Sequence, residues 1–120
     1  MRPEFGNAGV IGLPTRGWFL GHFVKEKSLR ATDAIEIKWG SHNAGRWTGW
    51  KSQPGKKTIT ILLSGEFVVQ FRSGKRLETF TLCAPGDFIV WEDDSEHRWK
   101  AITDAVVISA RWPSLLKQVK

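Results

Sequence analysis

The stretch PGDFIVWEDDSEHRW, residues 85–99, decides the fold prediction, because a tight turn, an apolar strand, an acidic bend and a second strand follow one another without a break. Pro85 and Gly86 are turn formers, and an apolar run comes directly after them. Beyond the bend, His97, Trp99 and Ala101 alternate with charged residues. Side chains of a strand alternate between its two faces, so these three residues share one face. We therefore expect His97 to face the interior of a β-structure.

The same period of two dominates the rest of the chain, and helical periodicity is almost absent. In residues 34–39, Ile35, Ile37 and Trp39 alternate with Glu36 and Lys38. Further strands are predicted at 57–63, 65–72, 77–82, 87–91, 97–102 and 104–112. Roughly eight to ten short strands with regularly spaced turns indicate an all-β sandwich or barrel. Only 113–120, which begins with Pro113, predicts a short C-terminal helical turn.

Length and composition are typical of a single globular domain. The chain has 120 residues, of which 41% are hydrophobic and 25% charged. No apolar run approaches the roughly 18 to 20 residues that span a bilayer, so we expect no membrane association. The N-terminus lacks an uninterrupted hydrophobic segment of signal-peptide length, which favours a cytoplasmic location. Cys83 is the single cysteine, and we expect it to be a small buried apolar residue.

Residues 1–17 differ in composition from residues 18–120, which form the predicted barrel domain. They are rich in Gly and Pro and contain no strand-length run. Two alternatives stay open for them: a disordered leader, or an arm that crosses onto a neighbouring subunit. The segment 104–112 is apolar on both faces, and the outer face of such a strand needs cover. This pattern supports the arm without deciding between the two alternatives. We expect a homodimer.

The opening stretch resembles the second conserved motif of the cupin superfamily, G-x5-P-x-G-x2-H-x3-N. Gly86 and His97 stand in register with the glycine and the histidine of that motif. The P-x-G bend is replaced by residues 92–94, Glu-Asp-Asp, and the terminal asparagine by Ala101. Similar flanking phrases lie at 36–45, 61–65, 85–91, 96–99 and 108–113.

The resemblance covers roughly residues 18–113. It implies a double-stranded β-helix, the RmlC-like cupin jelly-roll barrel, in a small single-domain protein similar to uncharacterised bacterial cupins. Such barrels carry many unrelated activities, so function has to be argued from the site itself.

The first cupin motif, G-x5-H-x-H-x3or4-E-x6-G, is not filled by metal ligands in this chain. When Gly65 is taken as its last glycine, Thr58 stands at the position of the glutamate. The two histidine positions hold either Lys51 and Gln53 or Ser52 and Pro54. Three histidines and one carboxylate would converge on a metal ion, whereas these side chains are weak donors or cations. The sequence therefore predicts no cupin metal and no cofactor.

Polar and aromatic side chains are expected to line the mouth of the barrel. A concave apolar pocket with a few converging polar groups is the usual form of a small-molecule site. We therefore predict binding of a small polar or anionic molecule, while the indoles of Trp50 and Trp99 could instead fill the core. Whether the protein is an enzyme is left open. The candidate ligand-binding residues are His42, Trp50, Gln53, Thr58, Thr60, Gln70, His97, Trp99 and Arg111.

Two other functions stay open as alternatives. One is a metal-dependent cupin enzyme of the isomerase, lyase or dioxygenase type that uses His42 and His97. The other is a basic β-barrel that binds nucleic acid, since 18 Lys and Arg against 12 Asp and Glu give a net charge of +6. No nucleic-acid motif is present and the basic residues do not cluster, which makes nucleic acid the less favoured partner.

Overall fold

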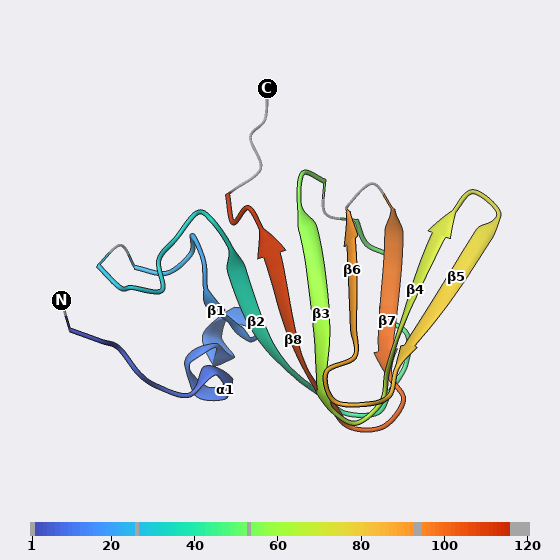
Figure 1. The fold of residues 1–120 in the computed structure, drawn as a ribbon, viewed down its shortest axis with the longest axis horizontal. Helices are drawn as coiled ribbons and strands as arrows, with labels where there is room; N and C mark the ends of the chain where they lie inside the picture. The colour runs from blue at the N-terminus through green and yellow to red at the C-terminus, as the bar shows by residue number, and fades with distance from the viewer. Residues whose placement is uncertain (1, 26, 53, 93–94, 116–120) are drawn as a thin grey trace.

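The structure is a computed structural model that describes residues 2–25, 27–52, 54–92 and 95–115 (Figure 1). These residues form eight strands and two short helical segments. The helices are α1 (Ala8–Ile11) and η1 (Leu13–Thr15), and the strands are β1 (Trp18–Leu20), β2 (Glu36–His42), β3 (Lys57–Ser64), β4 (Phe67–Ser73), β5 (Arg76–Leu82), β6 (Phe88–Glu92), β7 (Glu96–Ala101) and β8 (Ala105–Trp112). The bounds of β3, β5 and β8 differ from those predicted by at most one residue at either end.

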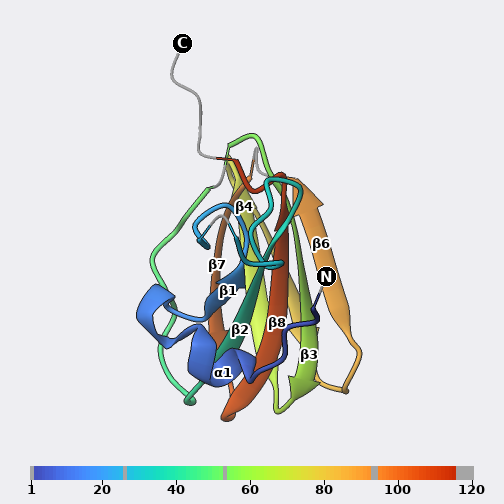
Figure 2. The ribbon, with the colours of Figure 1, turned by 90° about the vertical axis from the view of Figure 1, so that its left-hand side faces the viewer.

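The strands form two antiparallel sheets, which confirms the all-β, two-sheet prediction. One sheet has the order β1-β2-β8-β3-β6 and the other the order β5-β4-β7. After β3 the chain crosses to the smaller sheet for β4 and β5, returns for β6, crosses again for β7 and ends in β8. Figure 2 looks onto the outer face of the larger sheet, with β4 and β7 behind it. This crossing order is that of a jelly roll.

The turn that begins the opening stretch carries the chain from the smaller sheet to the larger one. Gly86 has a φ of 94°, a left-handed conformation that glycine adopts without strain. The carboxylate of Asp87 accepts hydrogen bonds from the backbone N–H of Ala84 at 2.9 Å and of Cys83 at 3.0 Å, and these bonds lower the pKa of Asp87. The N–H of Gly86 also donates to the carbonyl of Leu62. The glycine and aspartate of this motif therefore build the turn.

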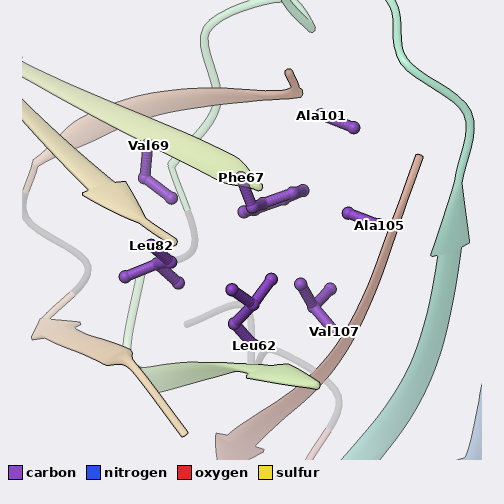
Figure 3. Packing of buried hydrophobic residues seen from close by; sticks show 7 residues of the cluster. All are labelled: Leu62, Phe67, Val69, Leu82, Ala101, Ala105 and Val107. Atoms are coloured by element: carbon purple, nitrogen blue, oxygen red, sulfur yellow. The ribbon is translucent and has the colours of Figure 1, made fainter. Parts of the chain in front are cut away.

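The hydrophobic core closes one end of the space between the sheets (Figure 3). Leu62 from β3 is fully buried, and Phe67 and Val69 from β4 are 3% and 1% exposed. Burying side chains of this size contributes about 1.5–3 kcal/mol each. The whole cluster consists of Leu62, Phe67, Val69, Leu82, Ala101, Ala105 and Val107.

The other end of this space is polar, because β2, β3 and β8 turn their polar side chains inward. Glu36, Thr58 and Thr60 are buried, at 2%, 6% and 4% exposure. Their apolar neighbours Ile37 and Ile59 therefore lie on the outer face of the sheet. The structure confirms the predicted alternation and shows which face is the inner one.

A buried ionic network joins β2 to the C-terminal part of the described chain. The carboxylate of Glu36 contacts the guanidinium of Arg111 at 2.6 Å and the ammonium of Lys56 at 3.1 Å. It also accepts a hydrogen bond from the hydroxyl of Ser114 at 3.0 Å. Burial raises the pKa of Glu36, but Arg111, Lys56 and Ser114 outweigh this effect and hold the pKa below its ordinary value of 4.5. The network ties β2 to β8 and to the segment after β8.

The segment that precedes β1 packs on the outer face of β2. Asn7 caps α1, and Gly9 lies against the indole of Trp39. Gly17, with a φ of 99°, brings its backbone against β2, and a Cβ there would lie 2.3 Å from the carbonyl of Trp39. Residues 8–17 therefore cover the β2 side of the outer face within the same chain.

The structure differs from the sequence-based predictions at Cys83 and at residues 113–115. Cys83 is exposed, which corrects its prediction as a buried residue. It follows Leu82, the last inward-facing residue of β5, and lies in the turn rather than in the sheet. In the predicted C-terminal helical turn, residues 113–115 are not helical and residues 116–120 lie outside the described residues. No helix in the described part of the chain is long and apolar enough to cross a membrane.

The Glu36→Gln variant tests the buried network. It leaves Arg111 and Lys56 without their carboxylate in a largely buried place, and breaking such a pair costs about 3 kcal/mol. Urea unfolding at neutral pH should show this loss in the free energy of unfolding. The control Glu78→Gln, at an exposed position, should change it by less than about 0.5 kcal/mol.

The difference between the wild type and Glu36→Gln should also depend on pH. The folded-state pKa of Glu36 lies below 4.5, so its contribution is full above that pH and is lost as the pH falls through the folded pKa. A difference that stays constant down to about pH 3 would contradict the network as the cause.

Candidate functional site

A cavity of about 290 Å³ lies between the two sheets at their polar end. β2, β3 and β8 supply its inner wall on the larger sheet, and β4 and β7 supply the opposite wall. Arg16 and Trp18 from the N-terminal region and Lys51 from the loop before β3 complete the lining. A volume near 300 Å³ is at the lower end of known small-molecule sites.

Four cationic side chains line this cavity: Arg16, Lys38, Lys51 and Arg111. No carboxylate is among its lining residues in the described part of the chain. Arg111 pairs with Glu36, whereas Arg16, Lys38 and Lys51 form no ion pair with any described residue. Burial lowers the pKa of Lys38, and the positive charges of Lys51, Arg111 and Arg16 lower it further. The cavity therefore concentrates positive charge that the described chain leaves uncompensated.

His97 faces this cavity from β7, as its alternation predicts. It is 8% exposed, and its Nδ1 atom is buried without a hydrogen-bond partner among the described residues. Its ring lies 5.0 Å from that of Trp91, between centroids. Burial lowers the pKa of His97, and Lys51 and Arg111 lower it further. The imidazole is therefore neutral at neutral pH and keeps one polar atom for a bound molecule.

His42 lines the same cavity from β2, in aromatic surroundings. Its ring centroid lies 4.4 Å from that of Trp99 and 5.9 Å from that of Phe67. The imidazole ring of His42 packs against Gly40. A side chain at position 40 would collide with it, because a Cβ there would lie 2.6 Å from Nε2 of His42. Burial and the charge of Lys38 lower the pKa of His42. This histidine is therefore neutral as well.

The donors in this cavity do not fit the metal that cupin barrels commonly hold. No group of three His, Cys, Asp or Glu within the described residues is placed to hold a metal ion. Thr58 lines the cavity where the resemblance places a carboxylate, and the ammonium groups of Lys38 and Lys51 line it too. A divalent cation would be repelled by these charges and would find only two imidazoles. We derive no metal chemistry for this site.

Most of the predicted site residues line the cavity, but not all of them. Trp50 and Gln70 lie instead on the outer face of the smaller sheet, where Gln70 contacts Thr79 and Arg98. Gln53 lies outside the described residues. The predicted residues that line the cavity are His42, Thr58, Thr60, His97, Trp99 and Arg111. Those that the sequence analysis did not propose as ligand contacts include Arg16, Trp18, Lys38, Lys51, Trp91 and Ser109.

Trp50 has a positioning role for the loop that carries Lys51. Its indole contacts the guanidinium groups of Arg72 and Arg98, which lie 4.2 and 4.6 Å from the ring centroid, and Arg98 also lies 4.5 Å from the ring centroid of Trp47. The backbone groups of Lys51 and His97 exchange two hydrogen bonds of 2.8 Å. These contacts hold the loop along the edge of β7 and place Lys51 at the cavity.

A serine, a histidine and a glutamate also meet, but not as a catalytic triad. The hydroxyl of Ser114 lies 2.8 Å from Nδ1 of His22, and Oε1 of Glu36 lies 3.5 Å from the same Nδ1. A hydrolytic triad uses the two ring nitrogens separately, one for the serine and one for the carboxylate. Ser114 is also fully buried. This cluster belongs to the structural network around Glu36.

A second, more open cleft of about 860 Å³ lies between β5 and β6. Its lining is largely apolar and includes Phe71, Phe80 and Phe88. It contains no cation among its described lining residues and no buried polar atom without a partner. The cationic cavity is therefore the better candidate for a specific site.

Comparison with solved structures supports the fold. KdgF from Halomonas sp. is 22% identical over 68% of this chain and 72% of that chain, with a TM-score of 0.59. A cupin superfamily protein from Desulfitobacterium hafniense is 18% identical over 74% and 81%, with a TM-score of 0.59. Protein NMB1881 from Neisseria meningitidis is 12% identical over 91% and 99%, also with a TM-score of 0.59. No protein-family model and no curated protein matches the sequence.

Two crossing antiparallel sheets around a cationic cavity define a small all-β domain of the jelly-roll class. Within that class, the chain has the fold of the cupin proteins to which it is similar, which confirms the resemblance seen in residues 85–99.

The two histidines that line the cavity, His42 and His97, should reduce stability in mild acid. Their folded-state pKa values lie below 6.5, so the unfolded chain binds protons more readily. The free energy of unfolding should therefore be highest above about pH 6.5 and fall as the pH decreases from there towards the folded pKa values. Urea unfolding between about pH 7.5 and 5.5 measures this decrease.

The matched comparison is the double variant His42→Gln, His97→Gln. It removes both titrating rings, so its free energy of unfolding should fall less over the same pH range. An equal decrease in the wild type and the double variant would show that other groups cause it.

Proposed function

We propose that this chain binds a small organic anion, a carboxylate or a phosphate ester, in the cavity between its two sheets. The observation that carries the proposal is the group of three cations, Arg16, Lys38 and Lys51, which face the cavity without an ion-pair partner among the described residues. Like charges held together in a partly desolvated space repel one another. A bound anion would relieve that repulsion, and its binding would raise the pKa of Lys38 towards the ordinary value.

The free energies of such contacts predict a dissociation constant in the range that is common for small metabolites. A hydrogen bond to a charged group contributes about 1.5–3 kcal/mol, so two of them contribute about 3–6 kcal/mol. That range corresponds to dissociation constants from the millimolar to the tens of micromolar range. A cavity of about 290 Å³ accommodates a molecule of that kind.

The inner wall of the cavity is polar at one end and apolar at the other, which suggests how the anion lies. Lys38, Ser109 and Thr60 form one row across β2, β8 and β3. The row below it consists of Gly40, Val107 and Leu62. We infer that the anionic group lies at the row of Lys38, within reach of Lys51, and that the body of the ligand extends towards Gly40 and the aromatic ring of His42.

The unpartnered Nδ1 of His97 supports a ligand with a further polar atom. A buried nitrogen without a hydrogen bond costs about 1–3 kcal/mol, which a ligand hydroxyl or carboxylate oxygen would recover. Because the imidazole is neutral, its Nδ1 can accept a hydrogen bond from the ligand or donate one, depending on which nitrogen carries the hydrogen.

The surface aromatics give nucleic acid less support than the cavity gives a small anion. A single strand is held by bases that stack on open aromatic faces. Trp50 already contacts two guanidinium groups, and Trp47 contacts Arg98 and Lys100. A base that stacked on these indoles would compete with those cation–π contacts.

Substitution of Lys51 tests the proposal. Phosphate, acetate, gluconate and benzoate serve as probes, and at least one of them should raise the melting temperature of the wild type in low salt. Lys51→Gln should weaken binding of that probe by roughly tenfold, the loss expected for one charge-assisted contact, as measured by calorimetric titration. Lys51 is exposed at the rim, so the variant should keep its fold.

The matched control is Lys75→Gln, which removes the same charge from the exposed turn between β4 and β5. It should bind the probe as the wild type does. Equal weakening in both variants would indicate a response to net charge alone, and the absence of binding by every probe would refute the proposed site.

A further inference from the structure

Lys38 differs from the other unpaired cations of the cavity in its surroundings. It is half-buried on the inner face of β2, whereas Arg16 and Lys51 are exposed. Its stem packs against the backbone of Gly17, since a Cβ at Gly17 would lie 3.2 Å from Cγ of Lys38. Its Nζ atom lies 5.8 Å from the ring centroid of Trp18. The amine is therefore held against the wall of the cavity and is partly shielded from water.

The formally charged groups that line the cavity around Lys38 are cations. Arg16 precedes β1, Lys51 lies in the loop before β3, and Arg111 lies on β8. The carboxylate of Glu36 lies two residues away on the same face of β2, but it is already paired with two other cations. Burial lowers the pKa of Lys38, and the three neighbouring cations lower it further. A larger share of this amine is therefore neutral and nucleophilic than in an exposed lysine.

Polar groups that can assist a reaction at the Lys38 amine lie on the same wall. Ser109 stands opposite Lys38 in the pairing of β2 with β8, and its hydroxyl lies 2.9 Å from that of Thr60. The ring of His42 folds back over Gly40, the residue between it and Lys38 on this face. Burial and the charge of Lys38 keep this imidazole neutral. Hydroxyl groups can bond to a carbonyl oxygen, and a neutral imidazole can take up and release a proton.

We propose that Lys38 forms an imine with the carbonyl group of an α-keto acid bound in the cavity. This inference rests on the proposed anion site and names the class of its ligand. In that binding mode the anionic group lies at the row of Lys38, so the carbon attached to it is the one that the amine reaches. A carbonyl at that carbon, next to the carboxylate, defines an α-keto acid. Arg16 and Lys51 remain available to hold the carboxylate.

The reaction needs no oxidant or reductant, takes up one proton and releases one molecule of water. The lone pair of the neutral Nζ attacks the carbonyl carbon, so that a C–N bond forms and the π electrons of the C=O bond move to oxygen. A proton passes from nitrogen to that oxygen and gives a carbinolamine. Its hydroxyl, protonated from solvent, leaves as water while the nitrogen lone pair forms the C=N bond. The protonated imine keeps one positive charge beside the carboxylate, so ion pairing also holds the product.

Reductive trapping of the full chain tests the imine. The wild type is incubated near neutral pH with pyruvate and sodium cyanoborohydride, which reduces the C=N bond and leaves a carboxyethyl group on the nitrogen. The intact mass should increase by one such group, and peptide mapping should place it on Lys38 before exposed lysines are labelled. Lys38→Arg keeps the positive charge but cannot form an imine, so the adduct at this position should be lost. The peptide map of the wild type locates the adduct even if this variant does not fold.

The matched control is Lys75→Arg, in the exposed turn between β4 and β5, which should be trapped at Lys38 as the wild type is. Lactate carries the same carboxylate without the carbonyl, so it separates this inference from anion binding. If lactate raises the melting temperature but pyruvate gives no adduct at Lys38, the imine is overturned and the anion site stands. If neither acid binds and no adduct forms at Lys38, both proposals are overturned. Labelling spread evenly over the exposed lysines also overturns the imine.

Discussion

The period of two in a β-strand is the constraint on which the rest of this structure depends. Lys38 can face the cavity only if Ile37 and Trp39 face outward, and the same holds for Thr60 between Ile59 and Ile61. Every side chain placed inside the larger sheet therefore puts its neighbour along the chain on the outer face, and at 37, 39, 59 and 61 that neighbour is apolar. The cationic cavity and the apolar part of the outer face are two results of one sequence pattern. The core that remains is concentrated where Leu62 and Val107 interrupt the polar series.

The buried carboxylate of Glu36 reduces the electrostatic cost of placing several cations on the inner face of the larger sheet. A cation that lines a partly buried cavity is stable only if enough of the surrounding charge is balanced. The negative charge of Glu36 offsets the charges of Arg111 and Lys56. Arg16, Lys38 and Lys51 line the cavity and have no ion-pair partner among the described residues. The division separates cations that hold the sheet together from those without an ion-pair partner among the described residues.

The sequence predicts those features that depend on neighbours along the chain. Alternation located most of the strands and the inward face of His97, and the Pro-Gly-Asp sequence located the turn before β6, although not the sheet to which that turn leads. It did not predict the side on which Trp50 lies, because residues 43–51 show no alternation from which a face could be read. Nor did it predict the cation cluster, since Arg16, Lys38 and Lys51 come from three separate segments. The partners of Glu36 are equally distant, 20 to 78 residues away along the chain.

The position of β8 determines when the cavity can form during synthesis. The last strand of the described chain lies at the centre of the larger sheet, between β2 and β3, which are both made much earlier. Until residues 105–112 have left the ribosome, β2 and β3 have no common neighbour and their cationic and apolar faces remain unassembled. The pairing of β4 with β5 is local, so this hairpin can form first, before β7 joins β4. Assembly of the cavity therefore waits for the last strand of the described chain, and the exposed strands β2 and β3 precede it.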